Sequence, residues 1–173
     1  MPDGVFSCVP HPLESRLRFS IRAEAFKIKY LETVAGMAFP TRIGEVVGVS
    51  DSFVACLGPD EWLLSVLLDA GDTRSAHLRD LATQSECSCV DISAREISIR
   101  LTGPTALDAI NSGCPSDLSG MPTPSVRRTV YDGTQIVVLR WGQHHFQIDI
   151  WRSFAPHLLA CLQKSKLGLD FNE

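Results

Sequence analysis

The segment from Val126 to Trp141 reads VRRTVYDGTQIVVLRW, and it decides the fold class. Its two halves are rich in β-branched and aromatic residues, and they meet at Asp132-Gly133, a pair that adopts the positive φ angles of a tight hairpin turn. The segment therefore predicts two antiparallel strands. Gly142-Gln143 marks a further turn, so a strand at His144–Trp151 extends the pair to a three-stranded meander.

Strands and helices are mixed on the amino-terminal side of this meander. Apolar residues fall at every second position in Glu96–Thr102, which is typical of a strand, and at helical spacing in Glu24–Met37. The other predicted strands are Leu17–Arg22, Ser52–Leu57, Glu61–Leu68 and Ser88–Ile92, and the other predicted helices run from Asp72 to about Ser85, from Gly103-Pro104 to Gly113, and onward from a cap at Ser153. Hairpins mixed with helices predict an α+β fold whose first half resembles a β-α-β-β-α-β unit.

Two of these helices carry specific expectations about their ends and faces. Gly113 is predicted to end its helix in the left-handed conformation, because glycine adopts that conformation without a steric penalty. The last helix follows the meander, and the hydroxyl of Ser153 is predicted to cap it. The side chains expected on the inner face of that last helix are Phe154, Leu158 and Leu162.

Length and composition predict one domain. The 173 residues are 45% hydrophobic and 21% charged, which is an ordinary globular composition. A domain of about 150 residues buries roughly 70% of its unfolded surface, so such a chain needs no disulfide or metal for stability. We expect an irregular leader at residues 1–16, one α+β domain at 17–166 and a frayed tail at 167–173.

Charge and hydropathy exclude several classes of partner. The net charge is -4 and the basic residues are scattered, so nucleic acid is not an expected partner. Apolar runs such as Trp62–Leu68 are too short to cross a bilayer, and the amino terminus lacks the pattern of a secretory signal. The sequence therefore predicts a soluble, cytoplasmic protein without a membrane partner, whose six cysteines are reduced thiols.

Residue patterns for chemistry are weak throughout the chain. Cys87-Ser88-Cys89 lies on a predicted strand, where its two thiols point to opposite faces and cannot chelate one metal ion. His145 and Asp149 share a strand face but have no nucleophile context beside them. Glycine patterns for nucleotide binding are also missing from the sequence. We predict no catalytic residue, no cofactor and no metal ligand in this chain.

Tryptophan and arginine residues beside polar turns stand out instead. These residues are Trp62, Trp141, Trp151, Arg95, Arg128 and Arg152. Tryptophan and arginine are enriched where one protein anchors another. Large indole rings also fill cores because they bury much apolar area. Both interpretations of the tryptophans, interface anchor and core filler, remain open at this point.

An ordered series of short motifs resembles one known family. The residues Leu57-Gly58-Pro59-Asp60-Glu61-Trp62-Leu63-Leu64 resemble the L-G-P-D-E-W-L signature of sarcosine oxidase gamma subunits. The series continues with Val90-Asp91-Ile92-Ser93, Leu101-Thr102-Gly103-Pro104, Gly113-Cys114-Pro115-Ser116-Asp117-Leu118, Arg128-Thr129 and Trp151-Arg152-Ser153-Phe154-Ala155. The resemblance covers the chain from about Leu17 to Leu162. Each motif is weak alone, and their order makes the set specific.

The resemblance implies a structural, non-catalytic gamma subunit of a heterotetrameric oxidase. Such a complex demethylates sarcosine oxidatively to glycine, forms peroxide and passes the one-carbon unit to tetrahydrofolate. The implied partners are an alpha subunit that binds folate and NAD, a beta subunit that carries the oxidising flavin, and a small delta subunit that binds zinc. FAD, FMN, NAD, tetrahydrofolate and zinc are thus expected in the complex, and none of them in this chain.

A second resemblance connects this family to the folate-binding part of the glycine-cleavage T-protein. It implies a T-protein-like fold, and it places Asp91, Ser93 and Asp117 at positions similar to functional residues there. Two alternatives to the structural role therefore remain open. The chain is a stand-alone folate-binding or one-carbon transfer module, or it is a gamma-type subunit of a related amine oxidase or dehydrogenase complex.

Overall fold

A computed structural model of the chain describes residues 7–10, 16–67, 74–81 and 87–170. The chain divides into two compact units, which are described separately below. The N-terminal unit comprises Pro12–Arg95, and the C-terminal unit comprises Glu96–Glu173 together with Met1–His11. The single domain expected at residues 17–166 stays a prediction.

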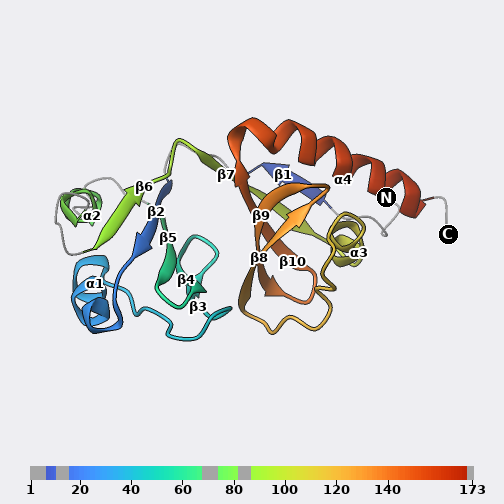
Figure 1. Cartoon of the computed structure of the whole chain (residues 1–173). Helices are drawn as coiled ribbons and strands as arrows, with labels where there is room; N and C mark the ends of the chain where they lie inside the picture. The colour runs from blue at the N-terminus through green and yellow to red at the C-terminus, as the bar shows by residue number, and fades with distance from the viewer. Residues whose placement is uncertain (1–6, 11–15, 68–73, 82–86, 171–173) are drawn as a thin grey trace. The chain divides into compact units, whose positions relative to one another are not determined.

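A five-stranded antiparallel sheet forms the centre of the N-terminal unit (Figure 1). Its strands, in spatial order, are β3 (Val46–Val49), β4 (Ser52–Gly58), β5 (Glu61–Leu67), β2 (Arg16–Arg22) and β6 (Ser88–Asp91). Helices α1 (Ile28–Ala35) and α2 (Arg74–Leu81) pack against each other on one side of it, and the short 3-10 turn η1 (Ala25–Lys27) leads into α1.

Alternating apolar side chains create the core of this unit. Phe19 and Ile21 lie two positions apart on β2, so both point to the same face, and both are fully buried. Leu31 of α1 and Leu78 of α2 are buried in the same cluster. Gly36 ends α1 with a φ of 63°, where a residue with a side chain would be strained.

A second five-stranded antiparallel sheet forms the centre of the C-terminal unit (Figure 1). Its strands, in spatial order, are β1 (Ser7–Pro10), β7 (Glu96–Thr102), β10 (His145–Trp151), β9 (Thr134–Gly142) and β8 (Ser125–Tyr131). The helical elements of the unit are α3 (Ala106–Asn111), the 3-10 turn η2 (Arg152–Phe154) and the long α4 (Ala155–Asp170).

One face of this sheet packs against the two helices. Ile148 of β10 lies opposite Ile99 of β7 and Val138 of β9, and all three are fully buried. Ile110 of α3 and Leu158 of α4 belong to the same core cluster. The α+β fold with its three-stranded meander β8-β9-β10 and C-terminal helix, predicted from the sequence, is confirmed.

Several local predictions differ from the structure at the sheet edges. Ser7–Pro10, predicted to lie in an irregular leader, forms β1 on the edge of its sheet, where a proline is tolerated. Strand β3 was not predicted, because a four-residue strand with a glycine in it has little sequence signal. The β-α-β-β-α-β order therefore contains one additional strand between α1 and β4.

The last helix also differs from its prediction. It continues to Asp170, where a frayed tail was expected from residue 167. Ser153 lies inside the 3-10 turn η2 and not at a helix cap, and Phe154 is 44% exposed instead of inward. Leu158 and Leu162 are buried as predicted. The 3-10 turn changes the rotation of the chain before α4, and this turns Phe154 outward.

The helix α3 is shorter than predicted. It begins at Ala106, beyond the predicted start at Gly103-Pro104, and its last helical residue is Asn111. For the second helix, the predicted cap Asp72 and the predicted end near Ser85 lie outside the described residues.

Candidate functional site

The turn Gly58-Pro59-Asp60 joins β4 to β5 and is held by local contacts. The peptide N–H of Ala23 donates to the carbonyl oxygen of Asp60 at 3.1 Å. The guanidinium of Arg22 lies 2.9 Å from the Glu61 carboxylate and 3.8 Å from that of Asp60. These contacts fasten the turn to the neighbouring β2 strand, so the most distinctive motif of the chain has a clear structural role.

Trp62 lies directly after this turn and fills the core of the N-terminal unit. Only 2% of the residue is exposed. Its indole N–H donates to the carbonyl oxygen of Pro40 at 2.7 Å, and the ring of Phe39 packs edge-on at a centroid distance of 5.8 Å. Of the two interpretations left open for the tryptophans, the core position is therefore the one that the structure supports for Trp62.

Asp91 and Ser93 interact with each other at the end of β6. The Asp91 carboxylate accepts hydrogen bonds from the peptide N–H of Ser93 at 2.9 Å and from its hydroxyl group. The Ser93 oxygen also accepts the peptide N–H of Arg18 at 2.9 Å. This arrangement closes a turn and attaches it to β2, which occupies both side chains in local structure.

Asp117 is an exposed residue of the C-terminal unit. Its carboxylate accepts the peptide N–H of Ser119 at 2.8 Å and the Ser119 hydroxyl at 2.7 Å. These two hydrogen bonds, with smaller contributions from Asn111 and Arg127, lower the pKa of the Asp117 carboxyl below its ordinary value of 3.8. Asp117 lies in the C-terminal unit, whereas Asp91 and Ser93 lie in the N-terminal unit.

The remaining residues predicted for an interface lie on the surface. Arg95 is exposed in the N-terminal unit, and Arg128 is exposed on β8 of the C-terminal unit. Trp151 ends β10 with 43% of its area exposed, and exposed Arg152 follows it. The ring of Phe154 lies 6.3 Å from that of Trp151, so two large exposed aromatic rings adjoin each other.

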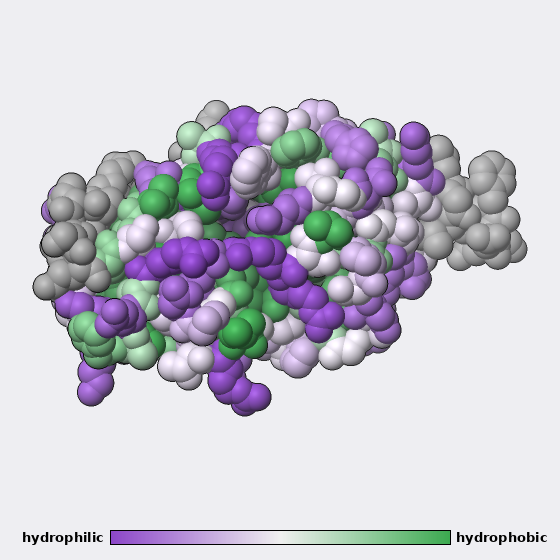
Figure 2. Space-filling view, in the orientation of Figure 1, coloured by the Kyte–Doolittle hydropathy of each residue, from purple (hydrophilic) through white to green (hydrophobic). Residues whose placement is uncertain are grey.

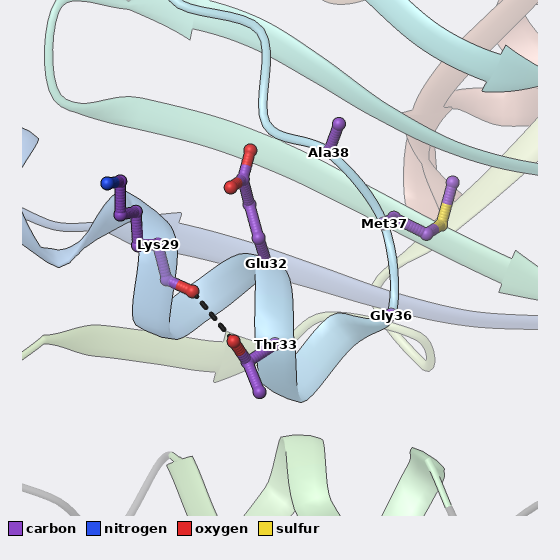
Figure 3. Close-up of a pocket in the computed structure, with 6 residues that line it drawn as sticks. All are labelled: Lys29, Glu32, Thr33, Gly36, Met37 and Ala38. Atoms are coloured by element: carbon purple, nitrogen blue, oxygen red, sulfur yellow. Dashed lines mark hydrogen bonds between the residues drawn. The ribbon is translucent and has the colours of Figure 1, made fainter.

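A shallow, open hollow lies along α1 (Figure 3). Glu32 accepts the peptide N–H of Phe39 at 2.9 Å, and the Thr33 hydroxyl donates to the carbonyl of Lys29 at 2.9 Å. Met37 contributes a thioether to the same nearly flat surface. The polar groups of the hollow therefore support the helix and its exit.

The cysteines of the described residues differ in burial. Cys56, Cys89, Cys114 and Cys161 are free thiols, and Cys87 is partly buried. Burial, with smaller effects of Cys87 and Asp91, raises the pKa of the Cys89 thiol to about 12. Such a thiol is protonated at neutral pH and unreactive.

One cluster of potential ligands was missed by the reasoning from sequence. Asp132 in the β8–β9 turn meets His157 and Cys161 on α4, and the potential ligand atoms of the three residues all lie within 4.8 Å of one another. The signal in the sequence was a histidine and a cysteine four residues apart on a predicted helix. The carboxylate is 25 residues away along the chain, so only the fold brings it to them.

Helices of the described residues include none that is long and apolar enough to span a membrane. No family model matches the chain.

The chain is similar in sequence to known proteins. It is 32% identical over 140 residues to the sarcosine oxidase subunit gamma of Corynebacterium sp. (strain U-96), and this match covers 76% of this chain and 65% of that protein. The subunit of the same name from Corynebacterium sp. (strain P-1) is 32% identical over 135 residues, which is 76% of this chain and 66% of the relative.

Solved structures extend the comparison to the fold. A chain of the heterotetrameric sarcosine oxidase from Corynebacterium sp. U-96 superposes with a TM-score of 0.84 at 24% identity, over 97% of this chain and 87% of that one. The glycine cleavage aminomethyltransferase T from Bartonella henselae superposes with a TM-score of 0.64 at 14% identity, over 92% of this chain and 45% of that one. The T-protein-like fold predicted from the sequence is confirmed.

This chain spans only 65–66% of the length of these two sequence relatives. The sequence match to the first of them covers 76% of this chain. The chain is therefore similar in sequence to sarcosine oxidase gamma subunits, and it shares the fold of a chain of the heterotetrameric enzyme.

Proposed function

We propose that this chain is the structural gamma subunit of a heterotetrameric sarcosine oxidase and performs no bond-making chemistry itself. The observation that carries the proposal is its homology to gamma subunits over 76% of its length. The enzyme as a whole oxidises sarcosine to glycine with formation of peroxide and transfers the one-carbon unit to tetrahydrofolate. FAD, FMN, NAD, tetrahydrofolate and zinc belong to the alpha, beta and delta partners in this proposal.

Contacts of the motif residues support a structural role. Trp62 is enclosed by its own unit, and Asp91 and Asp117 each accept hydrogen bonds from a residue two positions further along the chain. Residues that carry out acid–base chemistry instead converge on a space that a substrate can enter. These motif residues therefore stabilise turns and the core, which is consistent with a structural role.

Trp151, Arg152 and Phe154 supply the proposed docking surface for a partner subunit. Figure 2 shows a mainly hydrophilic face on which hydrophobic residues appear in small groups. Trp151 and Phe154 are each more than 40% exposed, and their rings adjoin each other. Tryptophan and arginine are among the residue types most enriched among the strong anchors of protein interfaces, and Trp151 and Arg152 are neighbours here. Arg128, on β8 of the same unit, is a further exposed candidate for the rim of such an interface, and Arg95 is an exposed candidate of the N-terminal unit.

Co-expression tests the proposal. The three partner subunits are purified with this chain, without it, and with its Trp151→Ala variant, and assembly, flavin content and sarcosine oxidation are measured. We expect a defective or unstable complex without the chain and a weakened one with the variant. If assembly, flavin content and activity are the same in all three preparations, the proposed role is wrong.

The folate alternative is tested on the isolated chain. Its specific support is the T-protein-like fold together with Asp91, Ser93 and Asp117. We expect no saturable binding of tetrahydrofolate, because the carboxylates of Asp91 and Asp117 are engaged locally. Micromolar binding that Asp117→Ala abolishes would favour a folate-binding module instead. Replacing sarcosine by other secondary amines in the complex assay tests the third possibility, a related amine oxidase or dehydrogenase.

A further inference from the structure

Asp132, His157 and Cys161 form a compact group of three different ligand types within the C-terminal unit. The Asp132 carboxylate lies 3.2 Å from His157 Nε2 and 3.4 Å from Cys161 Sγ. The distance between Cys161 Sγ and His157 Nε2 is 3.8 Å. The three atoms therefore mark a nearly equilateral triangle at the surface.

These separations match the edges of a zinc coordination tetrahedron. Zinc binds sulfur at about 2.3 Å and nitrogen or oxygen at about 2.0–2.2 Å, so tetrahedral angles place neighbouring ligand atoms about 3.4–3.6 Å apart. The observed values of 3.2, 3.4 and 3.8 Å lie around that range. In this structure the same contacts are an ion pair between His157 and Asp132 and hydrogen bonds of the Cys161 thiol to both of them, so the three groups already face one another.

The fold holds each ligand in place without help from a metal ion. Asp132 has a φ of 45° in the hairpin turn, and its peptide N–H donates to the carbonyl of Gly113 at 2.9 Å. His157 and Cys161 lie four positions apart on α4, and such residues share one face of a helix. Leu158 and Leu162 are buried on another face, which sets the rotation of the helix.

Tyr131, next to Asp132, ties the hairpin to both helices. Its side chain is buried, and its hydroxyl contacts the carbonyl of Ala109 on α3 and the hydroxyl of Ser165 on α4, both at 3.2 Å. Ser165 in turn donates to the carbonyl of Cys161 at 3.1 Å. A ligand group that is positioned in advance loses little entropy on binding a metal ion.

We propose that Asp132 Oδ2, His157 Nε2 and Cys161 Sγ bind one Zn²⁺ ion, which fastens the β8–β9 turn to α4. A nitrogen, a sulfur and a carboxylate oxygen are a ligand set suited to zinc, whereas Mg²⁺ and Ca²⁺ prefer oxygen ligands alone. On binding, the thiol proton is released to the solvent and the sulfur coordinates as thiolate. Asp132 and His157 are exposed, so water has access to the fourth position of the tetrahedron.

Metal titration of the full chain, freed of metal by a chelator, tests the site. We expect one equivalent of Zn²⁺ to bind by calorimetry, and one equivalent of Co²⁺ to produce a thiolate-to-cobalt charge-transfer band. Removing a ligand should weaken zinc binding by at least about tenfold, since even the loss of an outer-shell partner costs about 10–100-fold. The variants are Asp132→Asn, His157→Ala and Cys161→Ser, and Cys161→Ser should also lose the charge-transfer band.

Matched controls separate this site from other thiols and histidines. Cys114→Ser removes a thiol of the same unit and His144→Ala an exposed histidine, and both should bind zinc like the unchanged chain. Zinc should raise the melting temperature of the chain and of these controls, but not that of Cys161→Ser. Circular dichroism establishes that each variant is folded. A chain that binds no zinc, or Cys161→Ser that binds it as tightly as the unchanged chain, overturns the proposal, whatever the outcome for the oxidase subunit.

Discussion

Two tryptophans of the family-like motifs occupy opposite environments in the two units. Trp62 is 2% exposed in the N-terminal unit, where it donates a hydrogen bond to Pro40 and packs on Phe39. Trp151 is 43% exposed in the C-terminal unit and lies beside another exposed ring. Motif membership therefore does not reveal whether a residue serves its own fold or a partner, and stability and binding measurements can separate the two.

The largest expected effect is the loss of the Trp62 ring. Trp62→Ala should lower the free energy of unfolding by about 3–5 kcal/mol, because it removes a large buried side chain and leaves a cavity. Trp62→Phe retains an aromatic ring but loses the hydrogen bond to the Pro40 carbonyl, so we expect a smaller decrease in the free energy of unfolding. Urea denaturation of the isolated chain measures both. Equal stability of the alanine variant and the unchanged chain would place this ring outside the core.

Trp151 should show the reverse behaviour. Trp151→Ala is expected to change the free energy of unfolding by no more than about 0.5 kcal/mol, as is usual for surface substitutions. If the ring anchors a partner, binding to the partner subunits should weaken by about 2 kcal/mol or more. A quantitative pull-down beside a urea melt measures the two effects. A destabilised chain with unchanged binding would remove the contrast with Trp62.

Gly113 extends the contrast to a partly buried position beside the buried Tyr131 ring in the C-terminal unit. A Cβ atom at this position would lie 2.5 Å from Cζ of Tyr131, so Gly113→Ala should cost on the order of 1–3 kcal/mol through overpacking. Gly120→Ala is the matched control, since a Cβ atom there would meet nothing within 4 Å. Thermal or urea unfolding of the two variants measures the difference between their free energies of unfolding. Equal stability of Gly113→Ala and Gly120→Ala would show that the Tyr131 ring can move aside.

Asp117 is expected to show the smallest effect, a change in protonation. Its folded-state pKa lies below 3.8, so its contribution to stability is present above the unfolded pKa and is lost as the pH falls through the folded pKa. Ser119→Ala removes the hydroxyl hydrogen bond and should raise this pKa, while the peptide hydrogen bond keeps part of the shift. NMR titration of the carboxyl group measures the midpoint. An unchanged midpoint in the variant would contradict the role of the hydroxyl.

Local patterns allowed most elements to be predicted. The alternation in Glu96–Thr102 predicted β7 to the residue, and Asp132-Gly133 predicted the hairpin, whose φ angles of 45° and 77° require residues that tolerate positive values. The left-handed cap predicted at Gly113 is wrong: its φ is not positive, and glycine is needed there because the Tyr131 ring lies so close. A contact between residues 18 positions apart leaves no trace in a helix-end pattern.

The sequence by itself determined the periodicity of strands and helices, the turn chemistry and the ordered motifs of the gamma-subunit family, because each depends on residues close together along the chain. Only the tertiary structure decided that β1 and β3 pair as short edge strands, that Trp62 is buried and Trp151 exposed, and that Asp132 meets His157 and Cys161. These features depend on which distant segments lie side by side. Strand pairing and helix packing bring those segments together, and the spacing of residues close in sequence predicts neither of them.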